Sequence, residues 1–325
     1  MDCHRERPET GMSRASRERA SIVSGVGKTA GTPKRLNPEG RPGETVAVRA
    51  MTVADVPHAI ALTWDAFGID ADSSALLATW DARMRMMLRT DPAGAFVAVN
   101  AGGAVIGVAA ALARGHLWVL SLLAVRPATQ SKGAGRALMR AALDYRPELT
   151  DRLIMSTTDP RAMRLYSRAG FTLHPALLAS GQVRGGAVPT PDPRITEVAL
   201  DEIAELARIS VALRGGSHSE ELKMMAGVGA RIFRLADRGF VVVSAHHEVW
   251  LLAALDMETA AALLWSGLAR AGQSGPVRVR YVSGANQWAV DILVAAGLDV
   301  VADGAVAVAG NPGPLCPYIP SGPLA

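Results

Sequence analysis

The sequence contains only two cysteines, Cys3 and Cys316, in 325 residues. So few cysteines provide neither a disulfide framework nor a metal cluster, and this usage is typical of a reducing compartment. Long hydrophobic runs are also lacking, because apolar stretches such as residues 105–112 and 117–125 are much shorter than the ~20 residues of a transmembrane helix. The charged N-terminus has no apolar segment of the kind found in secretory signals. We therefore expect a cytoplasmic protein with no membrane partner and no metal site.

A basic domain surface is lacking as well, although the formal net charge is +4. Residues 1–44 hold nine Arg or Lys and six Asp or Glu, so this segment carries a net +3 and the remaining chain is nearly neutral. Folded nucleic-acid-binding domains present a clustered basic face, and we therefore expect no nucleic-acid partner. The same segment shows no hydrophobic periodicity, which predicts a disordered N-terminal tail.

Hydrophobic patterning begins near Thr45 and predicts two successive series of helices and strands. The first series occupies residues 45–180 and the second residues 194–325, joined by a linker, rich in proline and glycine, over residues 181–193. In the first series we expect helices over residues 56–67, 74–88, 135–145 and 161–169, and strands over residues 45–49, 96–99, 105–112, 117–125 and 153–156 and from Phe171. In the second we expect helices over residues 203–213, 259–270 and 286–296, and strands over residues 231–235, 240–244, 249–255 and 277–282.

The two series contain one clear internal match. Residues 156–171 align with residues 283–298, so that Ala162, Ala169 and Gly170 fall on Ala289, Ala296 and Gly297. A shared helix–glycine–strand unit in the same position of each series indicates a duplication.

A turn rich in glycine lies between the apolar strand of residues 117–125 and the following helix. Gly133 and Gly135 allow backbone N–H groups to approach a ligand closely. The unpaired donors of the first helical turn, with the positive end of the helix dipole behind them, form an anion site. Lys132 and Arg136 add positive charge, and a diphosphate is the expected ligand.

Two motifs in this first series resemble those of the GNAT superfamily of N-acetyltransferases. The first, Gln/Arg-x-x-Gly-x-Gly/Ala, is matched by Gln130, Gly133 and Gly135. The second, Asn-x-x-Ala-x-x-x-Tyr-x-x-x-Gly-Phe, is matched by Ala162, Tyr166, Gly170 and Phe171, with Asp159 in place of the asparagine. The resemblance covers about residues 45–180 and implies an α/β chain (the α+β GNAT fold) with two tandem GNAT-like domains, each a mixed, mostly antiparallel central sheet flanked by helices.

The resemblance also implies acetyl-CoA as co-substrate. Its expected site consists of Leu123, Ala124, Val125, Gln130, Ser131, Lys132, Gly133, Ala134, Gly135, Arg136, Asp159 and Tyr166. The edge of the strand at Leu123 and Val125 would pair with the pantetheine amides, and an N–H there would stabilise the oxyanion. Tyr166 would protonate the departing thiolate or, alternatively, belong to the core, and Asp159 would contact pantetheine or cap its helix.

No acidic residue lies on the strand that precedes the glycine-rich turn, where many relatives carry a general base. Ser121 is the candidate on this strand for holding a catalytic water, and His116 lies at the strand's beginning. The sequence favours a chain of waters or a residue between Asp65 and Asp91 over these two, and the base stays open.

The predicted function is acetyl transfer to a primary amine of a small molecule or a protein, by direct attack of the amine on the thioester. A non-catalytic module that binds or senses acyl-CoA is the alternative. The second series has Asp256 and Glu258 where the first has glycines, and Leu293 in the position of Tyr166, so we expect it to be catalytically silent. The acceptor is not readable from the sequence, because acceptor pockets are built from variable loops, and a homodimer is left open.

Overall fold

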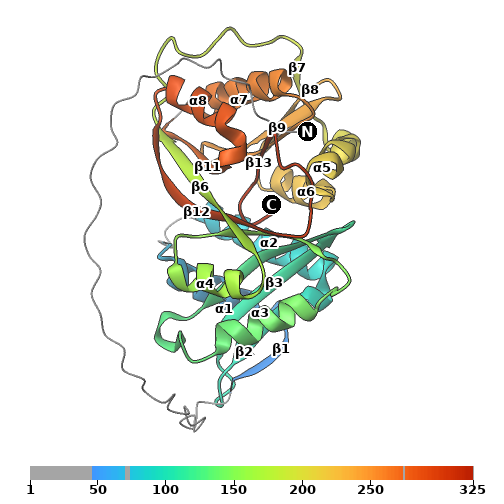
Figure 1. Ribbon diagram of the computed structural model, residues 1–325, viewed down its shortest axis with the longest axis vertical. Helices are drawn as coiled ribbons and strands as arrows, with labels where there is room; N and C mark the ends of the chain where they lie inside the picture. Colours follow the sequence, from blue (N-terminus) through green and yellow to red (C-terminus); the bar gives the residue numbers. More distant parts are fainter. Residues whose placement is uncertain (1–45, 70–73, 274, 325) are drawn as a thin grey trace, which may run out of the picture. The chain divides into compact units, whose positions relative to one another are not determined.

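The computed structural model describes residues 46–69, 74–273 and 275–324, and the tail predicted over residues 1–44 lies outside them. The described residues belong to one compact unit, Glu44–Ala325. A single 13-stranded sheet runs through this unit, flanked by helices (Figure 1). Within the described ranges, no helix is both long and apolar enough to cross a bilayer.

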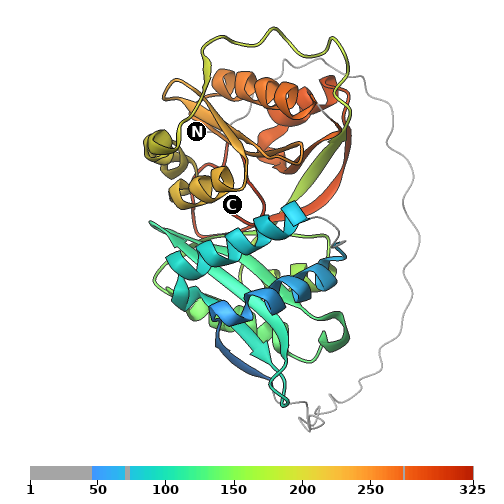
Figure 2. The same ribbon diagram turned by 180° about the vertical axis from the view of Figure 1, so that it is seen from behind.

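The first half of the unit follows the order of elements that the sequence predicts. These elements are β1 (Ala47–Ala50), α1 (Val56–Phe67), α2 (Ser74–Thr90), β2 (Ala95–Val99), β3 (Val105–Arg114), β4 (Leu117–Val125), α3 (Ala134–Asp144), β5 (Asp151–Ser156), α4 (Pro160–Arg168) and β6 (Thr172–Gly181). Helices α1 and α2 lie over one face of the strands (Figure 2), and α3 and α4 lie over the other (Figure 1).

Local signals explain why several of these bounds were predictable. Asp55 accepts hydrogen bonds of 2.8 Å from the Thr52 N–H and hydroxyl, which closes the short 3-10 turn Val53–Asp55 that leads into α1, and Pro57 lies in the first turn of the helix. Gly68 ends the same helix in the left-handed region, at φ 63°, a conformation that costs glycine little. The predicted helix over residues 56–67 is therefore confirmed at both ends.

The second half repeats the arrangement and adds elements that the sequence did not indicate. Its elements are β7 (Ile195–Glu197), α5 (Ala207–Arg214), α6 (Ser219–Gly227), β8 (Arg231–Leu235), β9 (Gly239–Val243), β10 (Glu248–Ala254), α7 (Met257–Ala271), β11 (Val277–Ser283), α8 (Gln287–Ala295), β12 (Asp299–Ala309) and β13 (Tyr318–Ile319). The additions are β7, α6, β12 and β13.

The order of strands in the sheet shows the duplication directly. It reads β1-β2-β3-β4-β5-β12-β6-β11-β10-β9-β8-β7, with β13 paired to β10. The parallel pairs are β4 with β5 and β10 with β11, and the other pairs are antiparallel. Each strand of the first half thus has a counterpart at the mirrored place in the second half. The predicted fold class, two tandem GNAT-like units with mostly antiparallel sheets, is confirmed.

The two halves exchange their last strands, which joins the two expected sheets into one. Strand β6 of the first half pairs with β11, and β12 of the second half pairs with β5. The exchanged strands also pair with each other along most of their length. The chain therefore crosses between the halves at β6, just before the predicted linker over residues 181–193, while the limits 45–180 and 194–325 stay predictions.

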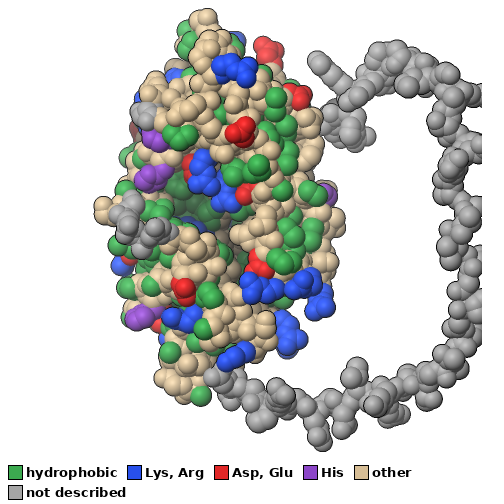
Figure 3. Space-filling model, turned by 90° about the vertical axis from the view of Figure 1, so that its left-hand side faces the viewer, with side chains coloured by type: hydrophobic (Ala, Val, Ile, Leu, Met, Phe, Trp, Pro, Cys, Tyr) green, Lys and Arg blue, Asp and Glu red, His purple; other side chains and the backbone are tan. Residues whose placement is uncertain are grey.

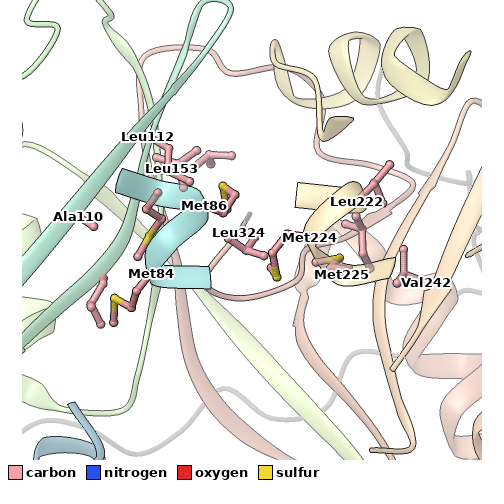
Figure 4. Packing of buried hydrophobic residues seen from close by; sticks show 14 of the residues in the cluster. Met84, Met86, Ala110, Leu112, Leu153, Leu222, Met224, Met225, Val242 and Leu324 are labelled. Atoms are coloured by element: carbon pink, nitrogen blue, oxygen red, sulfur yellow. The ribbon is translucent and has the colours of Figure 1, made fainter. Parts of the chain in front are cut away.

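A shared hydrophobic core also connects the halves. Figure 4 shows Met84 and Met86 of α2 on one side, Met224 and Met225 of α6 on the other, and Leu324 between them. All five belong to one cluster of buried side chains. The C-terminal segment is thus part of the core.

A buried ion cluster lies at the same boundary. Arg114 of β3 contacts Asp91 at 2.7 Å and Glu221 of α6 at 2.6 Å. Its guanidinium therefore forms an ion pair with one carboxylate from each half, and all three side chains are buried.

Candidate active site

Strands β4 and β5 run parallel and then separate, which opens an edge inside the sheet. Their pairing ends at Leu120 of β4 and Ile154 of β5. On its other side β4 stays paired with β3 to its end, with an irregularity at Ser121. Within the described residues, residues 121–125 therefore have no strand on the β5 side. This open edge carries Leu123, Ala124 and Val125.

The open edge leads into the glycine-rich turn and the start of α3. Ser131 and Gly133 adopt left-handed conformations, with φ 66° and 98°. Ala137 makes the first hydrogen bond of the helix, to the Gly133 carbonyl at 3.0 Å, so the N–H groups of Ala134, Gly135 and Arg136 have no acceptor within the helix. The residue before the helix, Gly133, has no side chain that could cap it. The start of α3 is therefore available to an anion, as the sequence predicts.

The side chain of Gln130 holds this turn in place. Its amide N–H donates to the Val125 carbonyl at 2.9 Å, and its amide oxygen accepts from Arg161 of α4. Gln130 thus connects the end of β4, the turn and α4, and its role in the structure is to position the turn. Lys132 and Arg136 are both exposed beside it.

A large cavity lies along the open edge and continues into the second half (Figure 3). Its volume is about 1470 Å³, larger than the ~300–1,000 Å³ of an ordinary ligand pocket, and it therefore has room for two substrates. Apolar side chains lie in its depth and Lys or Arg side chains on its rim (Figure 3). Lining residues of the first half include Arg83, Ser121, Gly133, Gly135, Asp159 and Tyr166, and those of the second half include Glu248, Arg278, Tyr281 and Pro323.

Tyr166 of α4 is both a core residue and a cavity residue. The side chain is 5% exposed and belongs to a buried cluster with Trp118 and Phe171. Its hydroxyl makes no hydrogen bond to any described residue, and burial raises its pKa. The hydroxyl therefore keeps its proton at neutral pH, as a general acid must. The core role and the catalytic role raised by the sequence are thus compatible in one residue.

Asp159 caps α4. Its carboxylate accepts a hydrogen bond of 2.8 Å from the Arg161 N–H and forms an ion pair of 2.9 Å with the Arg161 side chain. The hydrogen bond from the Arg161 side chain lowers the pKa of Asp159. Of the two roles that the sequence left open, the structure shows capping, and the contact with pantetheine stays a prediction.

The Ser121 hydroxyl is already engaged by protein groups. It donates to the Pro323 carbonyl at 2.5 Å, and Arg83 approaches the hydroxyl at 3.3 Å and also donates to the Ser121 carbonyl. The predicted role of Ser121, holding a catalytic water, would require the C-terminal segment to move away. The sequence did not indicate that Arg83 and the C-terminal segment meet β4.

The remaining candidate bases are distributed differently from what the sequence suggested. His116 lies at the far end of β4, beside Gly215 and away from the cavity. Asp91 is buried in the ion cluster with Arg114. Glu248, at the start of β10, is a carboxylate of the second half that lines the cavity and that sequence reasoning missed. Across the described part of the chain, no group of three or more His, Cys, Asp or Glu side chains could hold a metal ion.

The equivalent site in the second half is closed by the chain itself. Asp256 caps α7 by accepting from the Thr259 N–H at 2.8 Å, so a carboxylate occupies the position where α3 has an open terminus. Strands β10 and β11 also separate, after Val249, but β13 pairs with β10 there. Leu293, in the position of Tyr166, is buried.

Comparisons with known proteins agree with this geometry. Residues 59–171 match the family described as Acetyltransferase (GNAT) family. A proposed acetyltransferase from Pyrococcus horikoshii aligns over 86% of this chain and 94% of its own, with 15% identity and a TM-score of 0.68. A tandem GNAT protein from the clavulanic acid biosynthesis pathway aligns over 82% and 98%, with 14% identity and a TM-score of 0.52.

A GCN5-related N-acetyltransferase from Kribbella flavida aligns over 82% of this chain and 71% of its own, with 16% identity and a TM-score of 0.52. At such identities the structural likeness establishes the fold alone. No curated protein sequence matches the chain.

Proposed function

We propose that the protein transfers an acetyl group from acetyl-CoA to a primary amine of a small molecule or a protein. The match of residues 59–171 to the GNAT acetyltransferase family supports this proposal. Acyl-CoA-dependent acetyl transfer is the general activity of this family. The observation that carries the proposal is the open edge of β4 leading into the uncapped start of α3. One end of this path offers backbone groups to amides, and the other end offers N–H donors to a diphosphate.

In the proposed reaction the acceptor amine loses a proton to water in the cavity and attacks the thioester carbonyl carbon directly. A C–N bond forms and the C–S bond breaks. N–H groups of the β4 edge stabilise the negative oxygen of the tetrahedral intermediate. The sulfur leaves as a thiolate and takes a proton from the Tyr166 hydroxyl, which burial keeps protonated. The nitrogen gives up its second proton as the amide forms, and this proton returns through cavity water to the Tyr166 oxygen.

We place one acetyl-CoA in each chain, in the first half. Support for this asymmetry comes from the second half, where Asp256 caps α7 and β13 fills the gap beside β10. The cytoplasmic location and the homodimer stay predictions.

The test is release of free CoA thiol from acetyl-CoA by the purified protein, over a panel of small amines and peptides with free amino groups. Mass spectrometry of the product should show an acetylated amine. A Gly135→Glu variant provides the matched negative control, since we expect it to keep the fold and to place a carboxylate at the start of α3. Binding of acetyl-CoA without CoA release for any amine would overturn the proposal and favour a module that binds or senses acyl-CoA.

A further inference from the structure

Arg83 of α2 is a buried cation that lines the cavity, and its charge is not balanced by a neighbouring carboxylate. Its side chain is 5% exposed. Within residues 46–69, 74–273 and 275–324, Arg83 forms no ion pair with any Asp or Glu. Burial lowers its pKa to about 9, so the guanidinium remains charged at neutral pH. A buried, charged group without a partner is costly, which calls for an anion at this place.

Arg83 also has a hydrogen-bond donor without an acceptor. Its Nη2 donates to the carbonyl of Ser121 and lies 3.3 Å from the Ser121 hydroxyl, while its Nε is buried and has no hydrogen-bond partner among the described residues. The guanidinium carbon lies 4.7 Å from the centre of the Trp80 ring, which fixes its orientation. A guanidinium held in this way keeps one unused donor beside the cavity, and carboxylates bind guanidinium groups through charge-assisted hydrogen bonds.

The cavity-lining arginines of β11 and the buried Arg214 already have polar partners. Arg280 contacts Asp303 at 2.6 Å, and Arg278 contacts Glu248 at 3.5 Å. Arg214 is buried away from the cavity, and it donates to three backbone carbonyls. Arg83 differs from these in having both an uncompensated charge and an unused donor within the described parts of the chain.

Tyr281 of β11 adds a second polar group at the same place. Its side chain and that of Arg83 line the same cavity. Its backbone has φ 56°, an unfavourable conformation for a large side chain, and such strain is found where function requires it. Its hydroxyl makes no hydrogen bond to any residue that the structure describes.

We propose that Arg83, assisted by Tyr281, binds the carboxylate of the acetyl acceptor, so that the acceptor is a small amino acid-like molecule with a carboxylate next to its amine. This inference rests on the proposed acetyl transfer and names its acceptor class. Ser121, which Arg83 contacts, is only two residues from Leu123 on the open edge. Two residues of a strand span about 7 Å, so a carboxylate on Arg83 places an adjacent amine near the thioester.

The kinetic experiment compares α-amino acids with their own carboxamides as acceptors, using the full chain. The wild-type protein should prefer the acid by about 10- to 100-fold in kcat/KM, the size expected for a charge-assisted hydrogen-bonded pair. Arg83→Met should remove this preference by lowering kcat/KM for the acid alone, and Arg83→Lys should retain part of it. Arg85→Met, on the exposed face of the same helix and paired with Asp81, is the matched control and should behave as wild type.

Equal use of acids and carboxamides by the wild-type protein would overturn the assignment, and so would an equal loss for both in Arg83→Met. The latter result would mean that Arg83 only supports β4. Thermal melting of each variant shows whether it is folded.

Calorimetry of amino acid binding in the presence of CoA separates this inference from the proposed function, because CoA carries no acetyl group to transfer. Binding that favours the acid and depends on Arg83, without acetylation of any amine, would retain the inference and overturn the function. Equal acetylation of acids and carboxamides would retain the proposed acetyl transfer and overturn the assignment of Arg83.

Discussion

Gly135 offers the sharpest test of the acetyl-CoA site, because one substitution there should have opposite effects on folding and on binding. Gly133 is less suitable, since its φ of 98° penalises any side chain. Gly135 lies inside α3, and a Cβ added to it would lie 3.7 Å from a methyl group of Val125, an ordinary contact. Gly135→Ala and Gly135→Glu should therefore both fold.

The magnitudes follow from the position of Gly135 in the first turn of α3. A carboxylate there interacts favourably with the helix dipole, by about 0.3–1 kcal/mol, so the free energy of unfolding of Gly135→Glu should not fall. Against a bound diphosphate, a carboxylate at roughly 6 Å and an effective dielectric constant of about 20 costs about 3 kcal/mol. This corresponds to an affinity for CoA about 100-fold weaker.

Titration calorimetry with CoA, together with thermal melting, measures both effects. Gly135→Ala is the control: it adds the Cβ without the charge and should bind CoA nearly as wild type does. A folded Gly135→Glu protein with wild-type affinity would refute the placement of the diphosphate at α3. An equal loss in Gly135→Ala would show that space, and not charge, limits binding.

Further outcomes are expected at other positions. Tyr166→Phe should lower kcat by about 10²–10⁴, the usual contribution of a general acid, with unchanged affinity for acetyl-CoA; turnover within a factor of two of wild type would leave Tyr166 as a core residue only. Arg114→Met should lower the free energy of unfolding by about 3–5 kcal/mol, because Asp91 and Glu221 would remain buried without a counter-ion; a denaturation midpoint equal to that of wild type would contradict this. Calorimetry should count one CoA per chain, since β13 occupies the gap of the second half, and two would show a second working site.

Much of the first half was predictable because its signals are local. The bounds of α1 depend on the turn that Asp55 closes before it and on a glycine at residue 68, and β4 was readable as one apolar run. The start of α3 depends on glycines within a few residues of each other. Such features are determined by backbone conformation and by neighbours in sequence, so the uncapped, glycine-rich start of α3 could be predicted without the tertiary structure.

Other features depend on contacts between distant parts of the chain, and these only the tertiary structure decided. The exchange of β6 and β12 depends on which strand edges are available once both halves have formed. Strand β13 closes the second site only because the C-terminal segment returns to β10. Arg83 reads as an ordinary helical arginine until α2 packs against β4, which buries its charge. The sequence by itself thus determined the fold and the expected place of the cofactor. The surroundings of Arg83 in the cavity were decided by packing, because a charged group becomes costly only when the tertiary structure buries it.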